Sequence, residues 1–144
     1  MLNILFICVH NSARSQIAEE LLRQKLGDQV QVYSAGLEPG NLNPVVVDIL
    51  KEMGIDISGK QTRSVFDFIK QNIRFHYVVT VCDETSGERC PIFPGFTKRL
   101  HWTFPDPSSF QGTYEQKKEK TLEIVQMIDE KLEDFIIELQ PFLL

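Results

Sequence analysis

The sequence has little cysteine, no long apolar run and no excess of positive charge, and each shortage excludes a class of protein. Only three of the 144 residues are cysteines, too few and odd in number for the disulfide framework of a small secreted domain. No apolar run approaches the ~18 residues that suggest a membrane-spanning helix. The net charge of −5 argues against a nucleic-acid surface, which needs clustered Lys and Arg. We therefore expect neither a nucleic-acid nor a membrane partner, and an anionic ligand would need a local site.

The first residues do not have the features of a secretory signal. Met1 and Asn3 lead directly into the apolar run Ile4-Leu5-Phe6-Ile7, without a basic leader or a small-residue cleavage pattern. We expect a cytoplasmic protein, in which a reducing compartment keeps thiols free for chemistry. The length and the 42% hydrophobic content fit a single domain over residues 1–144.

Short apolar runs alternate with segments of helical periodicity along the chain. Strands are expected at Asn3–Cys8, Val30–Ala35, Phe75–Val81 and Arg99–Trp102. Helices are expected at Ser15–Lys25, residues 43–53, Val65–Asn72 and Tyr114–Leu139. This alternation, with short connections, predicts a doubly wound α/β sheet, in which ligands bind beyond the carboxyl ends of the strands. Cys8, Cys82 and Asp106 all follow predicted strands and can share that edge of the sheet.

The segment between the first strand and the first helix reads Cys-Val-His-Asn-Ser-Ala-Arg-Ser, residues 8–15. Such a loop can point several backbone N–H groups at one oxyanion, and the helix N-terminus adds its positive end. The same field favours the Cys8 thiolate, and the planar guanidinium of Arg14 can meet two oxygens of a tetrahedral anion at once. Taken singly, Cys8 could be a core thiol and Arg14 a surface charge, but their joint placement predicts a nucleophile at an oxyanion site. The expected oxyanion-binding residues are Val9, His10, Asn11, Ser12, Ala13, Arg14 and Ser15.

The run from Cys8 to Arg14, followed by Ser15, resembles the Cys-x5-Arg-Ser signature of low-molecular-weight protein tyrosine phosphatases. The segments Ser34-Ala35-Gly36 and Asp106-Pro107 extend the resemblance over essentially the whole chain. The resemblance implies a four-stranded parallel sheet flanked by helices on both faces.

Two roles inside the loop follow from the same resemblance. It implies that Asn11 holds the loop backbone in an unusual conformation and that Ser15 donates a hydrogen bond to the Cys8 sulfur. The ordinary alternatives are that Asn11 is a turn residue and that Ser15 is a helix cap. Both kinds of role can hold at once.

The region after the late Asp-Pro separates two branches of this family. Phosphatases carry tyrosines there, whereas this chain has Ser108-Ser109-Phe110. His101-Trp102 before the Asp-Pro, and Cys82 with Cys90-Pro91 upstream, resemble the arsenate reductase branch. This resemblance implies reduction of arsenate to arsenite, with phosphate or sulfate as competing oxyanions. The alternatives are a phosphatase in which Cys82 and Cys90 are structural or protective, and a non-catalytic anion-binding module, which would not need Cys8.

A reductase of this kind needs a thiol relay. After Cys8 has bonded to arsenic, Cys82 can attack the Cys8 sulfur and release arsenite. Cys90 can then attack Cys82 and move the disulfide outward, to be reduced by thioredoxin or a similar dithiol protein. The segment between Cys82 and Cys90 is polar and contains Gly87, which is the composition of a surface loop that can rearrange.

The remaining expectations concern the acid and possible ions. Asp106 is the candidate general acid, although Asp-Pro is also common in turns. The histidines His10, His76 and His101 have no metal-like spacing, so no metal and no cofactor is assigned.

Potassium-stabilised members of the family use four ligands. Asn11, Glu19 and Ser34 match the first three, but Arg63-Ser64 stands near the position of the expected acid. For Glu19, a place on a solvated helix face is the alternative.

Overall fold

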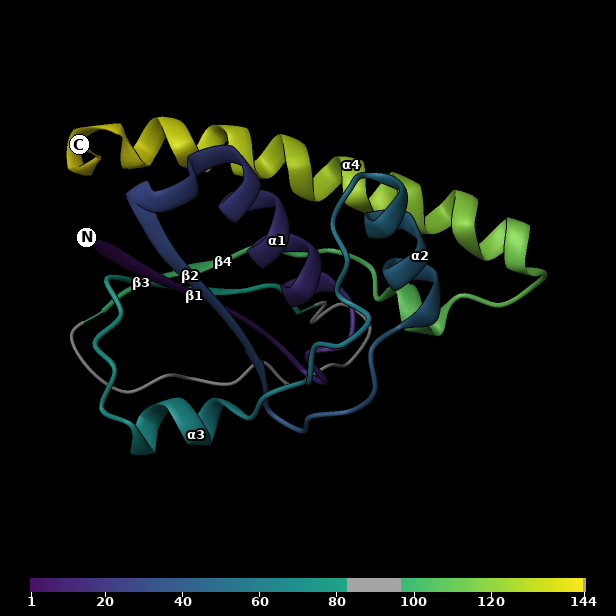
Figure 1. The fold of residues 1–144 in the computed structure, drawn as a ribbon, viewed down its shortest axis with the longest axis horizontal. Coiled ribbons are helices and arrows are strands. Elements are labelled where there is room, and N and C mark those ends of the chain that lie inside the picture. The colour runs from purple at the N-terminus through teal and green to yellow at the C-terminus, as the bar shows by residue number, and fades with distance from the viewer. Residues whose placement is uncertain (83–96, 144) are drawn as a thin grey trace.

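The structure is a computed structural model that describes residues 1–82 and 97–143 (Figure 1). Within these ranges the strands form one parallel sheet in the order β2-β1-β3-β4. The strands are β1 (Leu2–Cys8), β2 (Val30–Gly36), β3 (Tyr77–Thr80) and β4 (Lys98–His101). The α-helices are α1 (Arg14–Leu26), α2 (Pro44–Glu52), α3 (Val65–Lys70) and α4 (Tyr114–Leu139). Single 3-10 turns cover Gly27–Gln29, Pro107–Ser109 and Gln140–Phe142.

The predicted fold is confirmed, with small shifts at the ends of elements. The strand expected at Phe75–Val81 is shorter at both ends, although the Val81 N–H still donates to the Ile7 carbonyl. Helix α4 begins and ends where its periodicity predicted. The Thr113 and Gln116 side chains cap its first turn reciprocally, which fixes its beginning. Helix α2 begins at Pro44, whose missing N–H needs no partner there, and the Asn43 side chain caps the helix.

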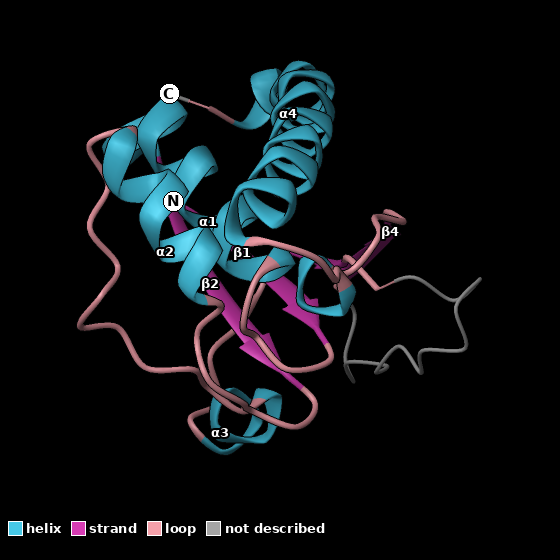
Figure 2. Cartoon of the chain, turned by 90° about the vertical axis from the view of Figure 1, so that its right-hand side faces the viewer, coloured by secondary structure: helices cyan, strands magenta, loops and turns pink. Residues whose placement is uncertain are grey.

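Helices cover both faces of the sheet. Helices α1, α2 and α4 lie on one face and α3 lies on the other (Figures 1 and 2). The larger core fills the space under α1, α2 and α4, and a smaller core under α3 contains Phe68, Phe75 and Val78. Burial of β1 between both cores explains why its sequence is almost continuously apolar. In the part of the chain that the structure describes, no helix is both long and apolar enough to cross a membrane.

The strand order places a crevice beside β1. The chain adds β2 on one side of β1 and β3 on the other, so the direction of winding reverses between β1 and β3. Open α/β sheets bind ligands at such a reversal, beyond the carboxyl ends of the strands. Cys8 is the last residue of β1, and Cys82 lies two residues beyond the end of β3. Topology alone therefore brings both thiols to the expected binding edge.

Candidate active site

The loop after β1 turns its carbonyl groups outward. The following segment donates backbone hydrogen bonds to them, from Leu37 to Cys8, Glu38 to Val9, Gly40 to His10 and Asn43 to Ser12. In a trans peptide the next N–H points opposite to each carbonyl, so the N–H groups of this loop face its interior. The Asn11 N–H, which donates to Cys8 Sγ at 3.1 Å, shows where that interior lies. The loop therefore turns its backbone N–H groups inward, and the binding of an oxyanion by these groups stays a prediction.

Gly36 allows the loop to lie against the end of β2. A Cβ atom at this position would stand 2.8 Å from three backbone atoms, Val9 O, His10 C and Asn11 N. Real Cβ atoms do not approach backbone so closely, so any side chain would push the loop away from the sheet. Glycine at position 36 of the Ser34-Ala35-Gly36 segment is therefore required for steric reasons.

We expect Gly36→Ala to weaken binding of inorganic phosphate by about tenfold or more, because the loop amides would no longer converge. Isothermal titration calorimetry measures the affinity, and a thermal melt verifies that the variant is folded. Gly59→Ala is the matched control, since a Cβ at Gly59 meets no atom within 4 Å. Unchanged phosphate affinity in a folded Gly36→Ala protein would show that a side chain at this position does not displace the loop.

The Cys8 sulfur is buried and surrounded by donors. Ser15 Oγ lies 2.9 Å from Cys8 Sγ, and Asn11 Nδ2 donates to Ser15 Oγ at 2.8 Å. Asn11 has φ of 55°, the left-handed conformation that Asn tolerates better than most residues. Ser15 is not the helix cap, because α1 begins at Arg14 and Ala13 precedes it without a side-chain cap. The expected contacts of Asn11 and Ser15 within the loop are present, and the alternative reading of Ser15 as a cap is wrong.

Arg14 is an interior residue with 2% of its surface exposed, so the alternative of a surface charge is wrong. Its Nη1 donates to the Phe104 carbonyl at 3.1 Å, and its Nη2 lies 3.8 Å from Asp106 Oδ2. Asp106 remains partly exposed, and its Oδ1 accepts from the Ser108 N–H. Arg14 therefore connects the oxyanion loop to the segment that carries the candidate acid.

Cys82 is fully buried, and the Cys8 thiol is buried as well. Ile7 pairs with Thr80 in the parallel register, so Cys8 stands opposite Val81 and Cys82 lies one residue further along. The third predicted relay thiol, Cys90, lies outside the described residues, as does the loop expected between it and Cys82.

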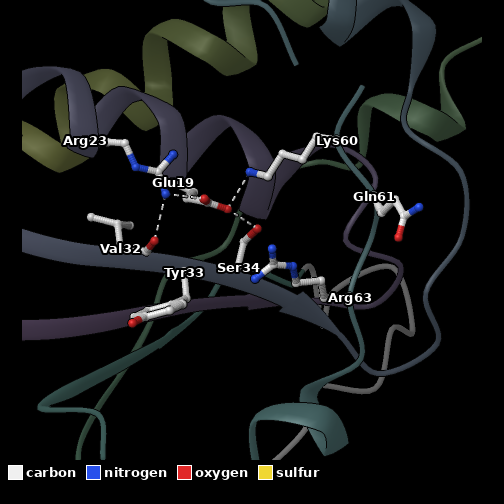
Figure 3. A pocket seen from close by; sticks show the side chains of 8 residues that line it. All are labelled: Glu19, Arg23, Val32, Tyr33, Ser34, Lys60, Gln61 and Arg63. Carbon is white, nitrogen blue, oxygen red and sulfur yellow. Dashed lines mark hydrogen bonds and ion pairs between the residues drawn. The ribbon is translucent and has the colours of Figure 1, made fainter. Parts of the chain in front are cut away.

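Glu19 lies in a small pocket and is not on a solvated helix face, so that alternative is wrong (Figure 3). Only 5% of its surface is exposed. Its Oε1 accepts from Ser34 Oγ and, at 2.6 Å, from Lys60 Nζ, and its Oε2 pairs with Arg23. Burial raises the pKa of Glu19, but the charge and hydrogen bond of Lys60, with hydrogen bonds from Ser34 and Arg23, outweigh it and hold the pKa below its ordinary value.

Two of the expected cation ligands are in contact with groups of the chain itself. Asn11 Oδ1 accepts from the Arg63 backbone N–H, and the Lys60 ammonium contacts the Glu19 carboxylate. The positive charge at Glu19 is therefore supplied by the chain. Sequence reasoning missed Lys60, because a lysine in a turn after Gly59 carries no local signal of burial.

The fold and this site define a class, that of α/β proteins with a buried cysteine at the end of a strand and a loop of inward backbone N–H groups before a helix. The model of the low molecular weight phosphotyrosine protein phosphatase family matches residues 3–141, and the chain belongs to this family.

Among curated relatives, the chain is 46% identical over 114 residues to a protein of Bacillus subtilis named arsenate reductase, covering 79% of this chain and 80% of the relative. It is 44% identical over 107 residues to an arsenate reductase of Staphylococcus epidermidis, covering 73% of this chain and 78% of that protein.

Solved structures show the same fold. A thioredoxin-dependent arsenate reductase of Corynebacterium glutamicum aligns with a TM-score of 0.69 at 32% identity over 97% of this chain, which spans 62% of the longer Corynebacterium chain. An arsenate reductase of Archaeoglobus fulgidus aligns with a TM-score of 0.65 at 27% identity, covering 88% of this chain and 96% of that one.

Proposed function

We propose that this protein reduces arsenate to arsenite and that a dithiol protein of the thioredoxin type returns the electrons. The observation that carries the proposal is the presence of two buried thiols at one sheet edge, Cys8 inside the loop after β1 and Cys82 beyond the adjacent strand. Phosphate-ester hydrolysis needs only the first of these thiols. The curated relatives named arsenate reductase and the thioredoxin-dependent neighbour support the same choice.

The first step is attack of the Cys8 thiolate on arsenic. The inward N–H groups of the loop bind the arsenate oxygens, and Arg14 stabilises the charge that grows as arsenic becomes five-coordinate. A sulfur–arsenic bond forms and an arsenic–oxygen bond breaks. Asp106, 3.8 Å from Arg14, protonates the departing oxygen.

The second step transfers two electrons. The Cys82 thiolate attacks the Cys8 sulfur, a disulfide forms, and the electron pair of the breaking sulfur–arsenic bond remains on arsenic, which leaves as arsenite. In our proposal Cys90 then attacks Cys82, frees Cys8 and presents a Cys82–Cys90 disulfide to the donor. Such a relay suits a reducing compartment such as the cytoplasm.

The direct test is arsenate-dependent consumption of NADPH in the presence of thioredoxin and thioredoxin reductase. We expect consumption to require arsenate and all three proteins, and to be inhibited competitively by phosphate or sulfate. Rapid hydrolysis of aryl phosphates without arsenate-dependent NADPH consumption would favour the phosphatase alternative and overturn the proposal.

We expect Asp106→Asn to slow formation of the thiol–arsenate adduct by roughly 10²–10⁴-fold, the usual contribution of a general acid, without weakening oxyanion binding. Asparagine can still accept the Ser108 N–H, so the turn should persist. Phosphate affinity should rise slightly, since a negative charge near the anion is removed. Rapid-quench analysis of the adduct and calorimetry with phosphate separate the two quantities.

Asp56→Asn is the matched control for this variant, because Asp56 accepts the Ser58 N–H in the same kind of turn at an exposed site. If phosphate binding fell together with the rate in Asp106→Asn, Asp106 would be holding the loop in place and would not be the acid.

A further inference from the structure

Gln16 is buried directly behind the oxyanion loop, and neither the family signature nor the proposed mechanism uses it. Its Nε2 donates to two oxygens of Asn11, the backbone carbonyl at 2.9 Å and Oδ1 at 3.0 Å. The orientation of this amide is forced, because a reversed Gln16 would face both acceptors with its own oxygen. Its Oε1 is buried, and the described residues offer it no hydrogen-bond partner. Native proteins rarely leave a buried acceptor unpaired. Gln16 nevertheless keeps this orientation, so its two hydrogen bonds to Asn11 need a functional explanation.

Two donors hold the orientation of the Asn11 amide. Its Oδ1 accepts from Gln16 and, at 2.9 Å, from the Arg63 backbone N–H, which can only donate. The Asn11 Nδ2 group must therefore face Ser15, where it donates to Oγ at 2.8 Å.

This fixes the direction of the next bond. Ser15 Oγ receives a proton from Asn11, so its own O–H is left to donate to Cys8 Sγ, 2.9 Å away. A sulfur that accepts from Ser15 and from the Asn11 backbone N–H is stabilised as the thiolate. If the Asn11 amide turned, Ser15 could instead donate to the Asn11 oxygen, and Cys8 would lose one of these two donors. Gln16 and the Arg63 backbone N–H both oppose this turn, and without Gln16 only the Arg63 N–H would hold Asn11 Oδ1 in place.

We propose that Gln16 is a positioning residue that acts through Asn11 and Ser15 to direct the Ser15 hydroxyl proton at Cys8 and so favour its nucleophilic thiolate. The inference deepens the proposed function, on which it rests, by assigning to α1 a residue that activates the nucleophile. The chain of donors runs in one direction, from the Gln16 amide through Asn11 and Ser15 to the sulfur.

The test is the pH dependence of Cys8 alkylation by iodoacetamide, resolved by peptide mass spectrometry in the full chain. In Gln16→Met, which keeps the side-chain volume but removes both donors, we expect the pH midpoint of Cys8 alkylation to rise by about one unit. Gln24→Met is the matched control, because Gln24 lies on the same helix with its side chain exposed. The pH midpoint of Cys8 alkylation should be unchanged in this variant. Alkylation requires no arsenate, so this result is independent of whether the reductase proposal holds.

A double variant tests the route. Ser15→Ala should raise the midpoint by itself, and adding Gln16→Met to it should produce no further shift if Gln16 acts through Ser15. A thermal melt verifies that each variant is folded. If Gln16→Met does not fold, Gln16→Ala replaces it in the same measurement. An unmoved midpoint in a folded Gln16 variant, or a fully additive shift in the double variant, would overturn the inference.

Discussion

Replacement of Cys8 by serine is expected to abolish arsenate reduction while leaving oxyanion binding in place. A serine hydroxyl is a poor nucleophile at neutral pH. It also cannot form the disulfide whose formation supplies two electrons to arsenic. A serine hydroxyl can still accept from the Asn11 N–H, so the loop amides and Arg14 should stay in place and phosphate should still bind. Turnover and phosphate affinity, measured on the same preparation, separate these two functions. Near-normal arsenate reduction by Cys8→Ser would end the hypothesis.

Arg14→Lys should retain Cys8 but lower the rate by roughly 10²–10³-fold, since a single ammonium cannot replace two guanidinium contacts to the growing charge. The loss should be accompanied by weaker competition from phosphate and sulfate. Lysine also cannot hold the Phe104 carbonyl and approach Asp106 at the same time, so the acid segment should loosen.

The second large effect is expected from the relay thiols in a single turnover without a reductant. Cys90→Ser should release about one equivalent of arsenite and trap a Cys8–Cys82 disulfide, because only the step that frees Cys8 is lost. Cys82→Ser should release almost none, since the adduct on Cys8 has no thiol to resolve it. Arsenite is measured by chromatography with elemental detection, and the disulfides by non-reducing peptide mapping.

The two variants serve as controls for each other, because each removes one thiol and leaves Cys8 intact. If both turned over repeatedly with thioredoxin, Cys8 would have to be reduced directly and the relay would be wrong. A Cys82–Cys90 disulfide in the oxidised wild-type protein is the corresponding positive result.

The fold and the loop could be predicted because their signals are local. The apolar run of β1 marks a strand buried on both faces, and residues 8–15 carry a thiol, a polar turn and a helix start in one uninterrupted segment. Helix α4 lies where its helical periodicity predicted, and its buried residues form the expected apolar stripe. Each of these features depends on residues close together in the sequence.

The support behind the loop could not be predicted, because it depends on contacts between distant segments. Lys60 reaches Glu19 across 41 positions, and the Arg63 backbone N–H reaches Asn11 across 52. On α1, Gln16 and Glu19 look like ordinary polar helix residues in the sequence, yet both are buried in the fold, where Gln16 contacts Asn11 and Glu19 contacts Ser34 and Lys60. Periodicity assigns such side chains to solvent, since it contains no information on what packs over a helix.

The Glu19–Lys60 ion pair affects how the stability of the fold depends on ions in solution. A counter-ion taken up from solution would stabilise the folded state only in proportion to its occupancy, so stability would follow the salt composition of the cell. A lysine side chain cannot dissociate from the chain, and its local concentration beside Glu19 is set by the fold. The packing of α1 against the segment behind the oxyanion loop therefore does not require a monovalent ion to be taken up from solution.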